Sequence, residues 1–268
     1  MRMAWSAFLW ASCGLFATVA EGQTLSDADR LTYAQRFGVA VFFFDKAAAI
    51  ATDEMKKVVP SASLPTTSGG MLVEPLEDAR LRVVFYRGEL DSAEVYFVAE
   101  LRDGRVTKKM FHERPLPLSA AQASLARASG AAAKVAVDSG YTPCTKLPFN
   151  PVVIPMGADG TAAVYLLSPQ IEADDYPMGG HFRIAVDGEG RLLGSRPLTR
   201  GCISTRDAAK DMPPGAIAMA AFISAPMDDT PTELHVFLSF ALQKPVYVAT
   251  RDGRLWQVDK VKISEVKR

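Results

Sequence analysis

The strongest hydrophobic pattern in this chain follows Ser26 and stops at Pro60. Apolar side chains recur there every three or four residues, which is the period of an α-helix. Ser26 stands three residues before Asp29, a spacing that is typical of a helix N-terminus. Because apolar residues cover more than one stripe, the pattern predicts a buried helix, which Gly38 bends or splits in two. The alternative is a strand at residues 39–44, where valine and phenylalanine favour extended structure.

Much of the remaining chain alternates apolar and polar residues with a period of two, as half-buried strands do. Four Asp-Gly pairs, at Asp103, Asp159, Asp187 and Asp252, interrupt this alternation and predict hairpin turns. Their spacing is not constant, so they do not indicate a solenoid or a propeller. The expected strands are residues 71–73, 81–86, 94–101, 106–111, 152–154, 162–167, 182–186, 191–196, 216–223, 233–240, 245–250 and 255–261.

A second helix is predicted where Ser119 and Gln122 form a capping box before an alanine-rich segment that Gly140 ends. Two helices among many hairpin-forming strands indicate an α+β fold. We expect antiparallel hairpins and meanders to pack around the buried N-terminal helix. Residues 23–268 are expected to form a single α+β domain, either undivided or with two sheet lobes that meet near residue 140.

Residues 1–22 differ in composition from the rest of the chain. Arg2 supplies a positive charge, and it is followed by an uncharged, apolar stretch that ends in small residues. This order is typical of a secretory signal peptide, with cleavage after Ala20 or Gly22. An uncleaved membrane anchor is the alternative, although the apolar stretch is at the short limit for a span. We therefore expect a periplasmic or secreted protein with no stable membrane span after cleavage.

The chain has three cysteines, and cleavage of the signal peptide removes Cys13. A lipid anchor on Cys13 is disfavoured because Trp10 stands where such sites have an aliphatic residue. Cys144 and Cys202 remain, and an oxidising compartment favours a disulfide between them. Two buried free thiols are the alternative. Neither cysteine belongs to a CxxC motif, so neither is expected to be catalytic.

Charge and motifs exclude several classes of function. Lysine plus arginine balances aspartate plus glutamate at 30 residues each, so no nucleic-acid partner is expected. The motifs HExxH, GxSxG and GxxxxGK(S/T) are absent, and no GxGxxG opens a helix, so no cofactor is expected. The histidines, at His112, His181 and His235, include no close-spaced pair and therefore predict no metal site.

Four polar residues of the expected strands are candidate site residues. His181 and Arg183 alternate on one strand, and Glu233 and His235 alternate on another. If these strands are neighbours, the four side chains gather on one sheet face, where they can bind an anion or pair a base with a carboxylate. The alternative is an ordinary polar sheet face in contact with water.

Asp45 is a further candidate because it follows three phenylalanines in the most apolar part of the first helix. A carboxylate in such a place is either buried and paired or faces a gap in the core. Arg183 or Lys46 is the expected partner of a structural ion pair. A catalytic carboxylate is the alternative.

Three segments, Phe42–Met55, Tyr176–Cys202 and Asp229–Val258, resemble a family of exported proteobacterial proteins that has no assigned activity. Together they cover about a quarter of the chain. The resemblance implies export and a single domain, and it implies no catalytic residue.

Two functions from different classes agree with these patterns. The first is a non-enzymatic binding or envelope-associated module for an unknown protein or small ligand, which predicts an exposed apolar or aromatic patch. The second is a periplasmic hydrolase that uses Asp45 or the face of His181 and His235, which predicts a pocket containing at least two of these side chains. Tyr247 and Trp256 are expected in the core, with a ligand groove as the alternative.

Overall fold

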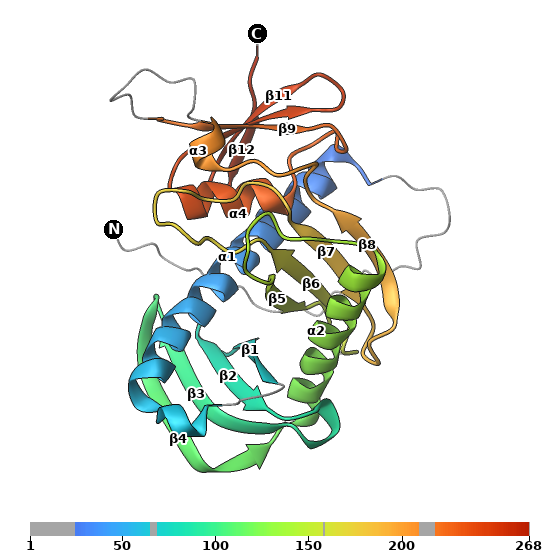
Figure 1. The fold of residues 1–268 in the computed structure, drawn as a ribbon. Helices are drawn as coiled ribbons and strands as arrows, with labels where there is room; N and C mark the ends of the chain where they lie inside the picture. The colour runs from blue at the N-terminus through green and yellow to red at the C-terminus, as the bar shows by residue number, and fades with distance from the viewer. Residues whose placement is uncertain (1–24, 65–68, 158, 209–217, 268) are drawn as a thin grey trace.

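The computed structural model of the protein describes residues 25–64, 69–157, 159–208 and 218–267. Within these ranges the chain forms three four-stranded sheets and a long N-terminal helix that contacts all of them (Figure 1). The helices are α1 (Asp27–Val58), α2 (Ala120–Asp138), α3 (Thr205–Ala208) and α4 (Glu233–Leu242), with 3-10 turns at Ser61–Ser63 and Leu90–Ser92. The strands are β1 (Gly69–Pro75), β2 (Leu81–Arg87), β3 (Glu94–Arg102), β4 (Arg105–Pro117), β5 (Asn150–Pro155), β6 (Ala162–Leu167), β7 (Phe182–Val186), β8 (Leu192–Pro197), β9 (Ala221–Ala225), β10 (Val246–Thr250), β11 (Leu255–Asp259) and β12 (Lys262–Glu265).

The three sheets follow one another along the chain. The first has the order β1-β2-β3-β4 and the second has the order β5-β6-β7-β8, and all their pairings are antiparallel. The third has the order β12-β11-β10-β9, in which β9 and β10 run parallel. Figure 1 shows them from bottom to top in this sequence. The expected α+β class is confirmed.

The Asp-Gly hairpin turns are present, and in three of them the aspartate side chain accepts hydrogen bonds from the backbone of the turn. Oδ1 of Asp187 accepts hydrogen bonds from the backbone N–H groups of Glu189 and Arg191, at 3.0 and 2.9 Å. Asp159 and Asp252 each accept an N–H from two residues ahead in the same way. The turn residue before Asp159 and the first two residues of the strand expected at 216–223 lie outside the described residues.

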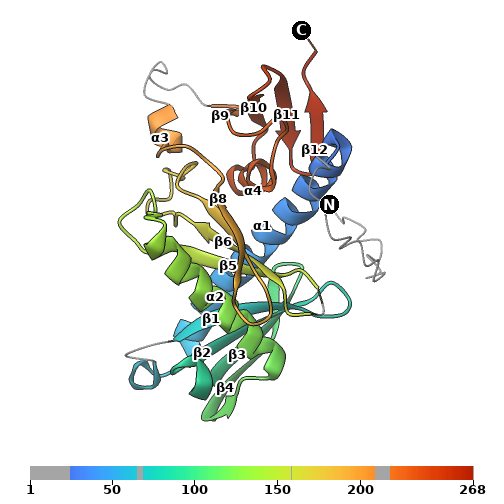
Figure 2. The same ribbon diagram turned by 90° about the vertical axis from the view of Figure 1, so that its right-hand side faces the viewer.

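The N-terminal helix α1 is the axis of the molecule. The Ser26 hydroxyl accepts a hydrogen bond from the Asp29 N–H, and Val59 is extended just before Pro60, so both predicted ends are confirmed. The helix runs unbroken through Gly38, which excludes both the split and the strand at residues 39–44. Figures 1 and 2 show α1 crossing the molecule from the third sheet to the first. Its apolar residues on several sides are buried because α4 and all three sheets contact it.

Gly38 marks the closest approach of α1 to α4. A Cβ atom built on Gly38 would lie 2.5 Å from the Glu233 carbonyl oxygen and 2.5 Å from the Val236 Cβ. Neither atom can rotate away, because one is a backbone oxygen and the other is the first carbon of a side chain. The glycine is needed for this helix contact and does not act as a bend.

Replacement of Gly38 by alanine is expected to lower the free energy of unfolding by roughly 2 kcal/mol, because overpacking forces the two helices apart. Gly130 is the matched control, since it lies within α2 and its Cβ would meet only the Leu90 Cδ1 at 3.7 Å. Gly130→Ala should instead stabilise the protein by about 0.5–1 kcal/mol through helix propensity. Urea unfolding followed by circular dichroism measures both changes. Two effects of the same sign would contradict the proposed helix contact.

The strand expected at residues 233–240 is wrong, because this segment is the helix α4. Residues 233–239 are all buried, between α1 on one side and the third sheet on the other. A helix that is buried all round has no polar stripe, so its apolar residues do not show the helical period. Because α4 connects β9 to β10 as a crossover, these strands can pair in parallel, which a hairpin would not allow.

The second predicted helix, α2, has the expected capping box. Ser119 and Gln122 exchange hydrogen bonds of 3.2 and 3.0 Å between side chain and backbone, and Gly140 follows the helix with a φ of 66°. Small alanines on one side of α2 pack on the second sheet and on Leu72 of β1. The second sheet is thus covered by α2 on one face, while its other face contributes to the core around α1.

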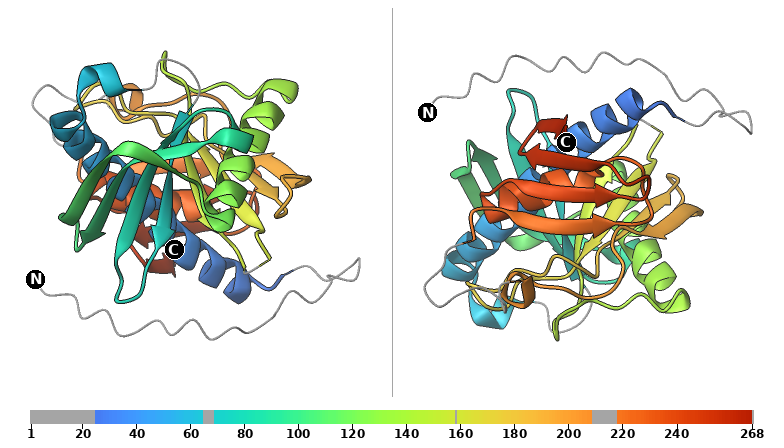
Figure 3. Two further views of the ribbon diagram at one scale, coloured as in Figure 1. Left: turned by 90° about the horizontal axis from the view of Figure 1, so that it is seen from below. Right: turned by 90° about the horizontal axis from the view of Figure 1, so that it is seen from above.

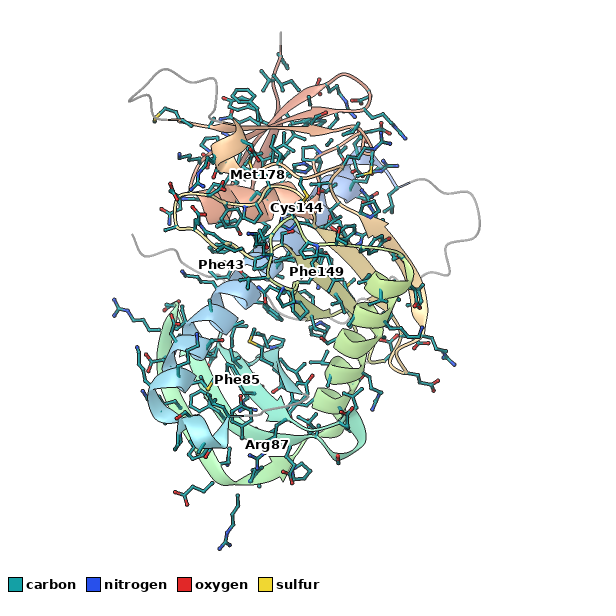
Figure 4. The ribbon with its side chains drawn as sticks, in the orientation of Figure 1. Phe43, Phe85, Arg87, Cys144, Phe149 and Met178 are labelled. Atoms are coloured by element: carbon teal, nitrogen blue, oxygen red, sulfur yellow. A yellow bond between two sulfur atoms is a disulfide. The ribbon has the colours of Figure 1, made fainter. Side chains whose placement is uncertain are left out.

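The predicted disulfide between Cys144 and Cys202 is formed, with 5.3 Å between the Cα atoms. It joins the segment before β5 to the segment after β8, so the whole second sheet lies inside the closed loop. Figure 4 places Cys144 between α4 and the second sheet in that view. The Ser168 hydroxyl accepts the Cys144 N–H at 2.8 Å and donates to the Gly180 carbonyl at 2.8 Å.

The predicted signal peptide, residues 1–22, and Cys13 within it lie outside the described residues. Among the described helices, none combines the length and the apolar character that crossing a bilayer requires.

Candidate functional site

Four side chains meet where α4 contacts α1 and the second sheet. Arg183 of β7 donates a hydrogen bond from Nη1 to Glu233 Oε1 at 2.8 Å and another to the Tyr33 hydroxyl of α1 at 3.3 Å. Tyr165 of β6 donates to the same oxygen of Glu233 at 3.4 Å. The Glu233 side chain is only 4% exposed. A buried ion pair and two tyrosines therefore connect four elements, which are α1, β6, β7 and α4.

Burial controls the protonation states of this cluster. Removal from water raises the pKa of Tyr33, and the neighbouring Glu233 raises it further. Burial raises the pKa of Tyr165 well above its usual range, and Glu233 again adds to the shift. For Arg183, burial acts against the charged form, but Glu233 and the tyrosines outweigh it and raise the pKa. Near neutral pH, neither phenol nor the guanidinium is poised to release a proton.

His181 lies just before β7 and is completely buried. Its Nδ1 accepts the Ser168 N–H at 3.2 Å, and its Nε2 lies 3.1 Å from the Pro177 carbonyl. Because Nδ1 is an acceptor, the ring proton is on Nε2 and is donated to Pro177. Burial lowers the pKa of His181 to about 4, although the Pro177 carbonyl opposes this shift. Both nitrogens of the neutral ring therefore hold the backbone between β6 and β7.

His235 lies in the first turn of α4 and is 1% exposed. Its Nδ1 accepts the backbone N–H of Thr232 at 2.9 Å, which caps the helix. Burial lowers the pKa of His235 to about 4, and the Asp228 carboxylate opposes this shift. Its Nε2 has no hydrogen-bond partner within the part of the chain that the structure describes. Like His181, this ring is neutral and bonded to the backbone.

Asp45 is half-buried in α1, and its Oδ1 accepts a hydrogen bond from the amide of Asn150 at the start of β5. Burial raises the pKa of Asp45 to about 6, although the Asn150 bond and the charge of Lys46 oppose the shift. The expected ion pair is wrong. Arg183 pairs with Glu233, Lys46 is exposed, and no described cation lies within ion-pair distance of Asp45.

The shared sheet face expected for the four polar residues is not formed. Arg183 and His181 do face α4, but Glu233 and His235 belong to a helix, in which residues two apart point to different sides. The structure therefore joins Arg183 to Glu233 and leaves the histidines in separate backbone contacts. The alternative of a polar face in water is also wrong, because α4 buries it.

Two pockets in the described surface lie away from all these residues. One, of about 760 Å³, is bordered by the start of α2 and by the turns at Asp159 and Asp187. The other, of about 430 Å³, lies on the first sheet. Neither pocket is lined by Asp45, Arg183 or the other candidates. Within the described ranges, no group of three or more histidine, cysteine or acidic side chains is placed to hold a metal ion.

The outer face of the third sheet points away from the rest of the molecule (Figure 3, right). Phe222 of β9 is 67% exposed, and its ring stacks on Tyr247 of β10 with 5.0 Å between centroids and 15° between planes. Trp256 of β11 points to the covered side and is 5% exposed, so its expected place in the core is confirmed. The prediction that Tyr247 lies in the core is wrong, because its side chain is on the outer face. No described helix covers the outer face, and β9 is an edge strand. We define the open face as Phe222, Ser224, Tyr247, Ala249 and Leu255.

Comparisons of the chain with protein-family models, with curated proteins and with solved structures find no match. The resemblance to exported proteobacterial proteins stays a prediction from the sequence.

Proposed function

We propose that this protein is an exported, non-enzymatic binding module that contacts a protein partner of the cell envelope through the open face. The observation that carries the proposal is the stacked pair of Phe222 and Tyr247 on a sheet face that no described helix covers. Aromatic side chains supply much of the binding energy in protein interfaces. Since these two rings already restrict each other, they lose little conformational freedom when a partner covers them.

Export is supported by two independent features. The composition of residues 1–22 is that of a signal peptide. The disulfide between Cys144 and Cys202 is a bond that oxidising compartments favour and that the cytosol reduces.

A hydrolase receives less support from the geometry. Its predicted pocket would contain at least two of the candidate side chains, yet the only two within hydrogen-bond distance, Arg183 and Glu233, are bonded to each other beneath α4. Asp45 has a raised pKa, but its hydrogen-bond partner is the amide of Asn150, which cannot act as a nucleophile or a base.

Replacement of both Phe222 and Tyr247 by serine is expected to reduce recovery of the envelope partner about tenfold or more, as loss of central aromatic residues does at interfaces. The protein is purified from the periplasm, immobilised, and exposed to solubilised envelope extract, and the proteins bound are quantified by mass spectrometry. Intact-mass measurement of the same preparation should show loss of residues 1–20 or 1–22.

Val137→Ser is the matched control, because Val137 is 80% exposed on α2, far from the open face in sequence and fold. This variant should retain the same bound proteins as the unmodified chain. Equal recovery by the double variant and the control would exclude the open face as the contact surface. An intact leader in the periplasmic fraction would exclude cleavage of the signal peptide, and absence of the protein from that fraction would exclude export.

A further inference from the structure

The pocket of about 430 Å³ on the first sheet is independent of the open face. It lies on the side of the sheet that faces away from α1, next to the start of α2. Its volume falls within the range of roughly 300–1,000 Å³ that is typical of small-molecule sites. The residues that line it are Arg82, Val95, Val98, Glu100, Lys108, Met110, His112, Leu116, Pro117, Leu118, Ser119 and Gln122.

An irregularity in β4 shapes this pocket. Val95 pairs with Leu116 and Phe97 pairs with Phe111, so residues 112–115 of β4 stand opposite the single residue Tyr96 of β3. Such an insertion bends a strand and interrupts its ladder. Beyond it β4 continues along β3 as far as Pro117, and the segment that leads into α2 forms one wall of the pocket.

The pocket has one charged end and an apolar middle. Arg82, Glu100 and Lys108 are paired across β2, β3 and β4 and form a charged row. The next row toward the bulge is Val98 with Met110, which is 45% exposed. Beyond it Leu116, 50% exposed, pairs with Val95. Met110 and Leu116 therefore expose apolar surface to water beside the charged row.

The charged end carries an excess of positive charge. Glu100 is already held by two arginines, with 3.1 Å to Arg80 Nη1 and 3.0 Å to Arg82 Nη2. Lys108 stands opposite Glu100 but forms no ion pair with any residue that the structure describes. Its neighbour Lys109 points to the other side of the strand and pairs with Glu54 at 2.7 Å. Glu74 of β1 stands opposite Arg82, so this end holds three cations and two carboxylates, and the ammonium of Lys108 remains for a ligand.

We propose that this pocket binds an amphipathic anion, a molecule with an aliphatic chain and one carboxylate head. The chain lies along Val98, Met110 and Leu116, where it removes apolar surface from water. The head lies at the charged row and receives a charge-assisted hydrogen bond from Lys108. This site is separate from the proposed protein-binding function.

Isothermal titration calorimetry of the disulfide-bonded protein with dodecanoate, below its micelle-forming concentration, tests the site. Dodecyltrimethylammonium carries the same chain with the opposite charge, and acetate carries the head without the chain. Dodecanoate is expected to bind at least about tenfold more tightly than either, because only it matches both ends of the pocket. Comparable binding of dodecyltrimethylammonium, or no dodecanoate binding at millimolar concentration, would overturn the proposal.

Two exposed positions locate the site. Lys108→Gln should weaken dodecanoate binding about five- to tenfold through loss of the charged hydrogen bond. Met110→Glu should weaken it by at least about tenfold, because it places a carboxylate against the chain. Lys56→Gln, an exposed lysine of α1, is the control and should leave the affinity unchanged. The Phe222→Ser/Tyr247→Ser variant should also bind dodecanoate normally, which separates this site from the open face. Unchanged affinity in both pocket variants would place the binding elsewhere and refute the assignment.

Discussion

Arg183→Met is expected to lower the free energy of unfolding by roughly 3–5 kcal/mol, among the largest effects of a single substitution in this protein. The change leaves the Glu233 carboxylate, whose side chain is 4% exposed, without the guanidinium that neutralises it. The hydroxyl of Tyr165 remains within 3.4 Å, but a neutral donor does not replace a positive charge in a buried site.

Substitution of Glu233 should lower the free energy of unfolding less than substitution of Arg183. Arg183 is 28% exposed, so after Glu233→Gln its guanidinium is still partly hydrated, and a smaller loss is expected. The double variant Arg183→Met/Glu233→Gln should recover much of the stability lost in Arg183→Met, because no buried charge remains.

Urea unfolding of the three variants at neutral pH measures this double-mutant cycle. Lys134→Met is the control, since Lys134 and Asp138 form a pair on α2 that is 76% and 59% exposed. The control should change stability by less than about 1 kcal/mol. If Arg183→Met were as mild as the control, the ion pair would not hold α4 on the second sheet. The pair would then again be a candidate for ligand binding.

Loss of the disulfide between Cys144 and Cys202 has the second largest expected effect, about 4 kcal/mol in the chain-entropy model. The sequence separation of 58 residues includes all four strands of the second sheet. Without the bond, the unfolded chain gains the freedom that this closed loop had removed. The Cys144→Ala/Cys202→Ala variant should therefore unfold at lower urea concentration.

A reducing agent separates this effect from a change in packing. It should destabilise the unmodified protein by nearly the same amount and should not change the double alanine variant. Equal stability of the oxidised and reduced forms of the unmodified protein would show that the bond does not constrain the unfolded chain.

Site residues were harder to predict than the fold, because polar residues show their role only through their neighbours. Arg183 and Glu233 were singled out from sequence, yet Tyr33 and Tyr165, which complete their cluster, carried no local signal. Asn150 likewise could not be recognised as the partner of Asp45, since α1 and β5 are far apart in the chain. Only a correct assignment of α4 would have indicated that the histidines are buried.

The amino-acid sequence alone determined the elements whose information is local. These are the capped helices α1 and α2, the Asp-Gly hairpins and the pair of cysteines, because periodicity, capping side chains and turn residues act over a few positions. The tertiary structure decided that residues 233–242 are helical, since a segment buried on all sides shows no period that distinguishes helix from strand. It also decided which polar groups are buried and which aromatic rings face water. These properties depend on which element packs over a surface, and residues distant in the sequence supply that element.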